Sequence, residues 1–325
     1  MENNAKKKFT LYISVVLGLL LIFLVFWRFF SSVFSKSISV KEDLSEKNYY
    51  TTLLFNENLT SDWKPSEVFG TSNKPEISGQ SAVLVDINSG KILYEKNSAE
   101  KMKIASLVKM MTAVVALEHK KIGDEIIASP KAATIGENIM GISASEVYTL
   151  EELLYGLILN SGNDAAYAIA EGVAGDVGTF GKWMNMKSKE LGLGDTYFAD
   201  PSGLSDESCS TAVDLVKLAR YAMQNEDFKR IAGTINIELP YSDKHKYLYL
   251  ENQTNLLTTY PGVAGIKTGY TEEAGYCLVT YARNENIELI GAVLKSENRK
   301  FDMIWMLDHG FSVLGLPINH PLLIF

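Results

Sequence analysis

Two side chains three residues apart, Ser106 and Lys109, are the first group in this sequence that could do covalent chemistry. They stand at the start of residues 104–117, a run that is apolar on nearly every side and therefore predicts a buried helix. Residues three apart share one helix face, so the hydroxyl and the amine can meet. Burial lowers the pKa of a lysine and leaves a fraction neutral, able to accept the serine proton. Taken alone, the pair is better explained by Ser106 as a helix N-cap and Lys109 as a surface lysine. The apolar residues around Lys109 and the two further groups described below favour a serine nucleophile with a lysine base, near helix N–H groups that can face negative charge.

A second group of polar side chains, Ser161 and Asn163, falls between two predicted helices. Thr149 and Glu152 form a capping-box pattern that starts the first of these helices. From the loop between them, Ser161 could relay a proton, and the amide of Asn163 could hold a substrate carbonyl or the lysine. A plain turn with Asn163 or Asp164 as the helix N-cap explains this short segment equally well when it is taken alone.

A third group, Lys267-Thr268-Gly269, follows an apolar stretch that predicts a strand. A fixed cation beside a hydroxyl suits the terminal carboxylate of a peptide. Gly269 has no side chain, so an extended substrate could lie against the strand and pair with its backbone. In isolation the tripeptide is better explained as a hairpin bend with a solvated lysine. The glycine-bracketed segment 265–276 and the two companion groups favour the carboxylate site.

The elements that must position these residues predict an α+β fold. Strands at 81–86 and 91–94 flank a turn at 88–90, and a helix-rich region follows from about 106 to 225. The chain then returns to strands at 263–268, 276–282 and 287–294, before a final amphipathic helix at 301–314. The short connections between the late strands favour antiparallel pairing. We expect one antiparallel sheet assembled from both ends of the domain.

The N-terminal part of the chain differs in kind from the rest. Residues 9–27 carry no charge and would form a helix about 28 Å long, close to the hydrocarbon thickness of a bilayer. Lysines 6, 7 and 8 precede the stretch, which favours a cytoplasmic N-terminus. A cleaved signal peptide is the alternative, but the run is long for one and no A-x-A-like cleavage site follows it. Under either interpretation the remainder of the chain is exported.

We accordingly expect four segments along the 325 residues. Residues 1–30 form a cytoplasmic tip and a transmembrane anchor, and the polar residues 31–78 form a juxtamembrane linker. A catalytic domain occupies residues 79–315 outside the cytoplasm, and residues 316–325 form a short tail.

Composition argues against several other functions. The net charge is −8 and the folded part has no Lys/Arg-rich block, so electrostatic binding of nucleic acid is not expected. None of the four histidines has metal-ligand spacing with a cysteine or another histidine, and we expect neither a metal nor a cofactor. Cys209 and Cys277 could form one bridge or none, and we favour two free thiols.

In this order the three groups match the S-x-x-K, S-x-N and K-T-G elements, and the chain resembles the serine-type D-alanyl-D-alanine carboxypeptidases of peptidase family S11. These are the low-molecular-mass penicillin-binding proteins. The resemblance runs from about residue 79 to 310, and it includes residues 110–112, 148–154, 200–204, 210–212 and 254–257. It implies a transpeptidase-like fold of the β-lactamase and penicillin-binding-protein type, with an antiparallel sheet flanked by helices and a helical subdomain.

The resemblance also implies roles for the residues. Ser106 would be the acylated nucleophile and Lys109 its base, while Ser161 and Asn163 would move protons and orient the substrate. Lys267 and Thr268, with Gly269 beside them, would bind the terminal carboxylate. The backbone N–H groups of Ser106 and Tyr270 would form the oxyanion hole. The reaction would remove the last D-Ala from a peptidoglycan stem peptide, and β-lactam antibiotics would inhibit it.

Three other functions remain as alternatives. A class A β-lactamase would add a Glu-x-x-Asn tetrapeptide, and residues 172–211 contain none. A D,D-endopeptidase that cuts peptidoglycan cross-links would use the same catalytic groups. A non-catalytic, anchored wall-binding protein would not need the reactive side chains that are all present here. The chain departs from many relatives in having little sequence after the last predicted helix, and in having Cys209 where they have histidine nearby.

Overall fold

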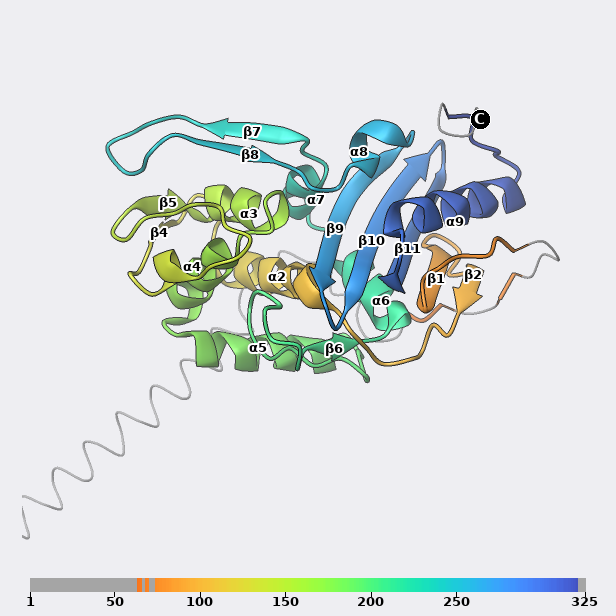
Figure 1. Cartoon of the computed structure of the whole chain (residues 1–325), viewed down its shortest axis with the longest axis horizontal. Coiled ribbons are helices and arrows are strands. Elements are labelled where there is room, and N and C mark those ends of the chain that lie inside the picture. The colour runs from red at the N-terminus through yellow and green to blue at the C-terminus, as the bar shows by residue number, and fades with distance from the viewer. Residues whose placement is uncertain (1–62, 66–67, 70–73, 321–325) are drawn as a thin grey trace, which may run out of the picture. The chain divides into compact units, whose positions relative to one another are not determined.

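The computed structural model describes residues 63–65, 68–69 and 74–320 of the chain (Figure 1). The predicted transmembrane anchor and most of the predicted linker lie outside the described residues. Within the described ranges, no helix combines the length and the apolar character needed to cross a bilayer.

A five-stranded antiparallel sheet is the framework of the domain. Its strands lie in the order β2-β1-β11-β10-β9, so the first two strands of the domain pair with the last three through β1 and β11 (Figure 1). The strands are β1 (Ser81–Asp86), β2 (Ile92–Lys96), β9 (Val263–Thr271), β10 (Gly275–Asn284) and β11 (Ile287–Ser296). The predicted α+β class, with one sheet built from both ends of the domain, is confirmed.

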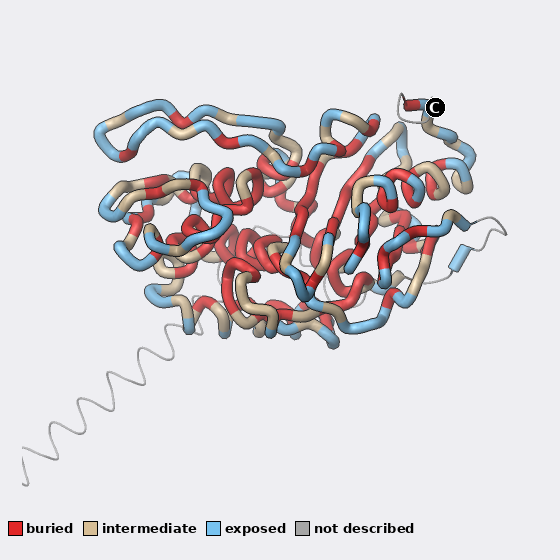
Figure 2. Tube along the Cα trace, in the orientation of Figure 1, coloured by how far each residue is buried: buried red, intermediate tan, exposed pale blue. Residues whose placement is uncertain are grey.

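Both faces of this sheet are buried. Successive side chains of a strand point to opposite faces, and in β1 Ala82 and Leu84 join a core cluster with α9 (Arg299–Val313), whereas Val83 and Val85 join the cluster of the other helices. Helix α9 covers the first face and α6 (Ala212–Ala222) packs against β1 and β11 on the other (Figures 1 and 2). This double burial explains why residues 82–85 of β1 form an unbroken apolar run rather than an alternating pattern.

Helix α2 (Lys109–His119) lies at the centre of the helical region. It contacts α3, α4, α5 and α6, and its residues from Lys109 to Glu118 are all buried, as the apolar sequence predicted. The surrounding helices are α3 (Leu150–Ile158), α4 (Asn163–Ala174), α5 (Val177–Glu190) and α7 (Glu226–Ala232). The predicted start of the helix at residue 104 is wrong: a separate 3₁₀ turn, η2 (Ala105–Val108), carries Ser106, and Ala105 has a φ of 48°.

Shorter elements complete the described fold. The predicted capping box is confirmed, since Thr149 Oγ1 accepts from the Glu152 N–H at 3.2 Å and Glu152 Oε2 accepts from the Thr149 N–H at 2.7 Å. Three small antiparallel pairs were not predicted: β3 (Met102–Lys103) with β6 (Cys209–Ser210), β4 (Glu125–Ile127) with β5 (Val147–Thr149), and β7 (Asn236–Leu239) with β8 (Leu248–Glu251). A four-residue helix, α8 (Leu256–Thr259), and the 3₁₀ turn η3 (Ala132–Thr134) are also present. Cys209 and Cys277 are free thiols, as predicted.

The described residues before position 79 contact the sheet. Val68 forms a parallel bridge with Ile92, and the Phe69 N–H donates to the Ile92 carbonyl at 2.8 Å. The Tyr94 hydroxyl donates to the Pro75 carbonyl at 3.1 Å. Residues 68 and 69, which were expected to belong to a linker, therefore pair with the backbone of β2. The domain boundary at residue 79 stays a prediction.

Truncation of Leu84 tests the core between the sheet and α9. The side chain is fully buried in the α9 cluster, so Leu84→Ala should lower the free energy of unfolding by about 2–5 kcal/mol through lost burial and a residual cavity. Urea unfolding followed by circular dichroism measures the change. Ile127→Ala, at a side chain 69% exposed, is the matched control, and an equal loss in both variants would contradict this account of the core.

Candidate active site

The amine of Lys109 and the hydroxyl of Ser106 meet as the sequence predicted. Lys109 Nζ lies 2.9 Å from Ser106 Oγ. Two further oxygens surround the same amine, the side-chain Oδ1 of Asn163 at 2.7 Å and the backbone carbonyl of Ser202 at 2.6 Å. Lys109 is fully buried, so these contacts replace water around the nitrogen.

The three contacts determine where the lone pair of a neutral Lys109 amine points. The Ser202 carbonyl can only accept a hydrogen bond, and so can Asn163 Oδ1. The orientation of the Asn163 amide is set by its other end, because Nδ2 donates to the Gly136 carbonyl at 3.0 Å. A neutral amine has two N–H groups and one lone pair. With both N–H groups used by these oxygens, the lone pair faces the Ser106 hydroxyl, which is the arrangement a general base needs.

Burial also sets the pKa of Lys109. Desolvation lowers the pKa from its usual value to about 7, while the negative charges of Asp200, Asp164 and Glu137 raise it and offset part of this effect. A substantial fraction of the amine is therefore neutral near pH 7. A lysine with a pKa close to the working pH can both take the serine proton and give it up again.

The Ser161–Asn163 segment is not a plain turn. Gly162 is the N-cap of α4, and Asn163 is the first helical residue, with its side chain turned to Lys109. Asp164 does not act as the N-cap either: its carboxylate accepts from the N–H groups of Met140, Gly141 and Ile142, at 2.7, 2.7 and 3.1 Å. It thereby fixes the loop that passes beside Asn163.

Ser161 is held in an unfavourable state. Its backbone has a φ of 58°, its side chain is buried, and its hydroxyl has no hydrogen-bond partner among the described residues. Left-handed backbone at a residue with a side chain and an unsatisfied buried hydroxyl both cost free energy. A proton-relay role for Ser161 stays a prediction.

The loop containing Asp200 supports the nucleophile turn, and the sequence alone did not assign it this role. The Asp200 carboxylate accepts from the N–H groups of Ser202, Gly203 and Ser205, at 2.6, 2.7 and 2.8 Å, and so aims the Ser202 carbonyl at Lys109. Gly203 has a φ of 80°, and a Cβ there would lie 2.1 Å from the Ala105 carbonyl oxygen. Only glycine permits this close approach.

Strand β9 brings the K-T-G residues against the same turn. A Cβ on Gly269 would lie 3.2 Å from the Ser106 nitrogen, so the bare glycine lets the strand contact η2. The strand continues to Thr271, beyond its predicted end at 268. Lys267 is buried, and its Nζ donates to the Thr268 carbonyl at 3.1 Å. Burial, with the positive charges of Lys109 and Arg299, holds the pKa of Lys267 well below its usual value.

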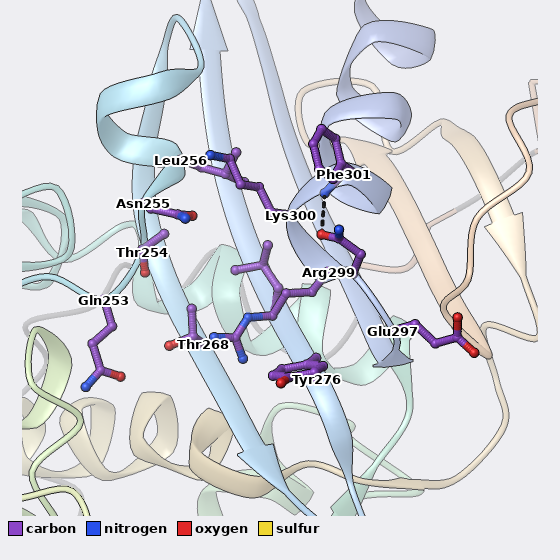
Figure 3. A pocket seen from close by; sticks show the side chains of 12 residues that line it. Gln253, Thr254, Asn255, Leu256, Thr268, Tyr276, Glu297, Arg299, Lys300 and Phe301 are labelled. Atoms are coloured by element: carbon purple, nitrogen blue, oxygen red, sulfur yellow. Dashed lines mark hydrogen bonds between the residues drawn. The ribbon is translucent and has the colours of Figure 1, made fainter. Parts of the chain in front are cut away.

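Arg299 is the residue that sequence reasoning missed. It donates to the Gly269 carbonyl at 2.7 Å, and its guanidinium carbon lies 5.3 Å from the Tyr276 ring centroid. With Thr268 it lines a pocket on the α9 side of the sheet, where the two side chains lie next to each other (Figure 3). No motif marks Arg299, because its place beside Gly269 depends on how α9 packs over β9 and β10.

Ser106, Lys109, Asn163, Lys267 and Gly269 are thus brought together, and Ser161, Thr268 and Tyr270 belong to the same converging segments. It stays a prediction that the backbone N–H groups of Ser106 and Tyr270 form the oxyanion hole. The constellation offers a nucleophile, a buried base and a cluster of cations for an anionic substrate group. Chemically, it can perform acyl transfer on a substrate that carries a carboxylate.

Residues 68–298 match the family model described as D-alanyl-D-alanine carboxypeptidase, Peptidase_S11. The chain is 38% identical over 252 residues to the D-alanyl-D-alanine carboxypeptidase DacF of Bacillus subtilis, an alignment that covers 75% of this chain and 64% of that protein. It is 32% identical to the D-alanyl-D-alanine endopeptidase of Escherichia coli, over 68% of this chain and 73% of the relative. The crystal structure of D-alanyl-D-alanine carboxypeptidase from Mycobacterium tuberculosis is similar with a TM-score of 0.70 and 30% identity, covering 76% of this chain and 96% of that one.

The pKa of Lys109 predicts how acylation of Ser106 depends on pH. A base whose pKa is about 7 gains its neutral form as the pH rises, so the rate should climb about tenfold per pH unit below 7 and level off above it. The charge of Glu137 raises this pKa, so Glu137→Gln should move the rising part of the curve of acylation rate against pH to lower pH. Mass spectrometry of Ser106 modified by an uncharged acylating reagent measures the rate. Glu100→Gln, at another exposed carboxylate, is the control, and a rising part that stays in place or moves to higher pH in Glu137→Gln would refute the assignment.

Proposed function

The chain belongs to the D-alanyl-D-alanine carboxypeptidase family of serine peptidases, and we propose that it removes the terminal D-Ala from peptidoglycan stem peptides through an acyl-enzyme on Ser106. The observation that carries this proposal is the Lys109 amine, which has Ser106 Oγ at 2.9 Å and its remaining contacts filled by acceptors. This arrangement activates a serine without histidine.

The first half of the reaction forms the acyl-enzyme. Lys109 takes the Ser106 proton, and Oγ attacks the carbonyl carbon of the penultimate D-Ala. The negative charge that develops on the carbonyl oxygen is stabilised by the backbone N–H groups of Ser106 and Tyr270, a contribution typically worth about 100- to 1000-fold in rate for each donor. The peptide C–N bond breaks, and the leaving amine receives the proton through Lys109 and Ser161.

The second half returns the enzyme to its starting state. Lys109 accepts a proton from a water molecule, which attacks the ester carbonyl and releases the shortened peptide with the Ser106 hydroxyl restored. Asn163 holds Lys109 in place throughout, at 2.7 Å from its amine. A β-lactam reacts through the first half, because opening its amide bond acylates Ser106 in the same way.

In the proposed reaction, the positively charged side chains of the site bind the terminal carboxylate of the substrate. Lys267 and Thr268, as predicted from the motif, would bind it together with Arg299: Lys267 is buried near Lys109 and Arg299, and Thr268 and Arg299 line the pocket on the α9 side of the sheet. Because burial disfavours the charges of both Lys267 and Arg299, and Arg299 also repels Lys267, an incoming carboxylate would stabilise the charged form of both side chains. This places the last residue of the peptide, and so the scissile bond, next to Ser106 Oγ.

The chain's location forms part of the same proposal. The uncharged residues 9–27 would anchor the protein in the cell membrane with the catalytic domain outside, where peptidoglycan lies. The acidic net charge of −8 argues against a nucleic-acid partner.

Loss of the Ser106 hydroxyl should abolish covalent labelling by a fluorescent penicillin. Ser106→Ala should also lower D-Ala release from a pentapeptide by about 10³-fold or more, because no other group can carry the acyl chain. Ser312→Ala, at an exposed serine of α9, should label and turn over like the wild type. Label retained on Ser106→Ala would contradict the nucleophile assignment, and a wild type without label would favour the non-catalytic wall-binding protein.

Removal of residues 1–30 should release the protein from membranes without loss of penicillin labelling. The anchor supplies about 28 Å of apolar helix, whereas the site lies wholly within residues that follow it. Fractionation of the full chain and the truncated chain, with labelling of each fraction, measures both properties. A truncated protein that stays with the membrane, or a full-length protein that N-terminal sequencing shows to be cleaved after residue 30, would contradict the anchor.

A further inference from the structure

The guanidinium of Arg299 is bound to the rest of the protein through one of its nitrogens. Nη1 donates to the Gly269 carbonyl at 2.7 Å and, in a longer contact, to the Cys277 carbonyl at 3.4 Å. Within the described residues these are the hydrogen bonds of the group, so the N–H groups of Nε and Nη2 are left for a ligand. In the proposed reaction that ligand is the terminal carboxylate, which a guanidinium can bind through two parallel hydrogen bonds.

Contacts at a single nitrogen do not fix the plane of the guanidinium. The planar group can still turn about Nη1, and each orientation points the free N–H groups in a different direction. An arginine side chain also has many rotamers, so ordering it costs free energy. If the substrate has to order the group, this cost is subtracted from its binding. A further contact that fixes the plane beforehand would therefore strengthen the binding of a carboxylate.

The ring of Tyr276 supplies such a contact. Its centroid lies 5.3 Å from the guanidinium carbon of Arg299, within the range of a cation–π interaction. Figure 3 shows the guanidinium between this ring and Thr268, and all three side chains line the same pocket. Arginine stacks on aromatic rings, and a ring in this place limits how the planar group can turn. The ring thus restricts the motion that the hydrogen bonds at Nη1 leave open.

The ring of Tyr276 is itself supported by Tyr270. The two residues are directly opposite each other on β10 and β9, and their ring centroids lie 4.7 Å apart. Aromatic pairs of this kind stabilise each other across two strands. Tyr270 is 53% exposed and Tyr276 is 44% exposed, so neither ring belongs to the core. A role in the core of the domain therefore does not explain why two aromatic rings lie here.

We propose that Tyr276 is a positioning residue, whose ring, supported by Tyr270, holds the Arg299 guanidinium in the orientation that binds a terminal carboxylate. The inference rests on the proposed function, which assigns that carboxylate to Lys267, Thr268 and Arg299. Tyr276 acts through Arg299 and not on the reacting atoms. It fixes, before the substrate arrives, a geometry that the substrate would otherwise have to induce.

The preference of Ser106 for reagents that carry a carboxylate tests the proposal. Benzylpenicillin and its methyl ester differ only at that group, and mass spectrometry of Ser106 measures the second-order acylation rate for each. The full-length wild type should react faster with the acid than with the ester. In Tyr276→Leu the ratio of the acid rate to the ester rate should fall about threefold to tenfold, as expected for the loss of a cation–π contact. Tyr276→Phe keeps the ring and should keep most of the ratio.

A double variant shows whether the ring acts through Arg299. Arg299→Leu should lower the acid-to-ester ratio, and adding Tyr276→Leu to it should lower the ratio no further. Tyr249→Leu is the matched control, because Tyr249 is a strand tyrosine with a similar exposure of 49% and lies outside the pocket lining. It should keep the wild-type ratio. General damage to the nucleophile turn would slow the reactions of the acid and the ester alike, and so would leave the ratio unchanged.

The outcomes distinguish this inference from the proposed function. If the wild type prefers the acid and Tyr276→Leu keeps the full ratio, the positioning role is refuted and the proposed function stands. The role is likewise refuted if Tyr276→Phe loses as much of the ratio as Tyr276→Leu, or if the losses from Tyr276→Leu and Arg299→Leu multiply in the double variant. A wild type that reacts with neither compound, or with both at the same rate, would contradict the proposed function, and the role of Tyr276 would fall with it.

Discussion

The buried amine of Lys109 is the group on which the rest of the catalytic unit depends. Taken out of water, it loses the solvation that keeps a lysine charged, and its pKa falls to about 7. A neutral amine in this place is useful only if its lone pair faces the nucleophile, so its two hydrogens must be bound elsewhere. Asn163 and Ser202 bind them, and they come from segments far apart in the sequence. The helices around α2 are arranged so that all three partners meet.

The close approach of three backbone segments is the second requirement. The nucleophile turn contacts the loop at Gly203 on one side and strand β9 at Gly269 on the other. A Cβ on Gly203 would block the first contact, because it would lie 2.1 Å from the Ala105 oxygen, and a Cβ on Gly269 would crowd the second at 3.2 Å from the Ser106 nitrogen. The Asp200 carboxylate holds the first of these loops through three backbone N–H groups. Rigid support of this kind maintains catalytic geometry within a fraction of an ångström.

The positively charged side chains lie on one side of the site, so the site favours one orientation of an anionic substrate. Lys109 lies at the nucleophile, Lys267 lies on β9, and Arg299 lies at the start of α9 next to Gly269. Burial disfavours the charge of each of the three side chains. In the proposed reaction, the anionic end group of a substrate would bind at Lys267 and Arg299, and the bond one residue before it would reach Ser106. The same electrostatic arrangement would thus orient the substrate in the proposed reaction.

The sequence by itself determined the reactive groups and the class of the fold. Motif spacing paired Ser106 with Lys109, the capping box at Thr149 set the start of α3, and the order of strands and helices predicted an antiparallel sheet built from both ends of the domain. These features are local, or depend only on the order of elements. Tertiary structure alone decided the 3₁₀ turn under Ser106, the role of the Asp200 loop and the place of Arg299 beside Gly269. The reason is physical: each depends on contacts between segments separated by tens of residues or more, and neither propensity nor periodicity carries information about such contacts.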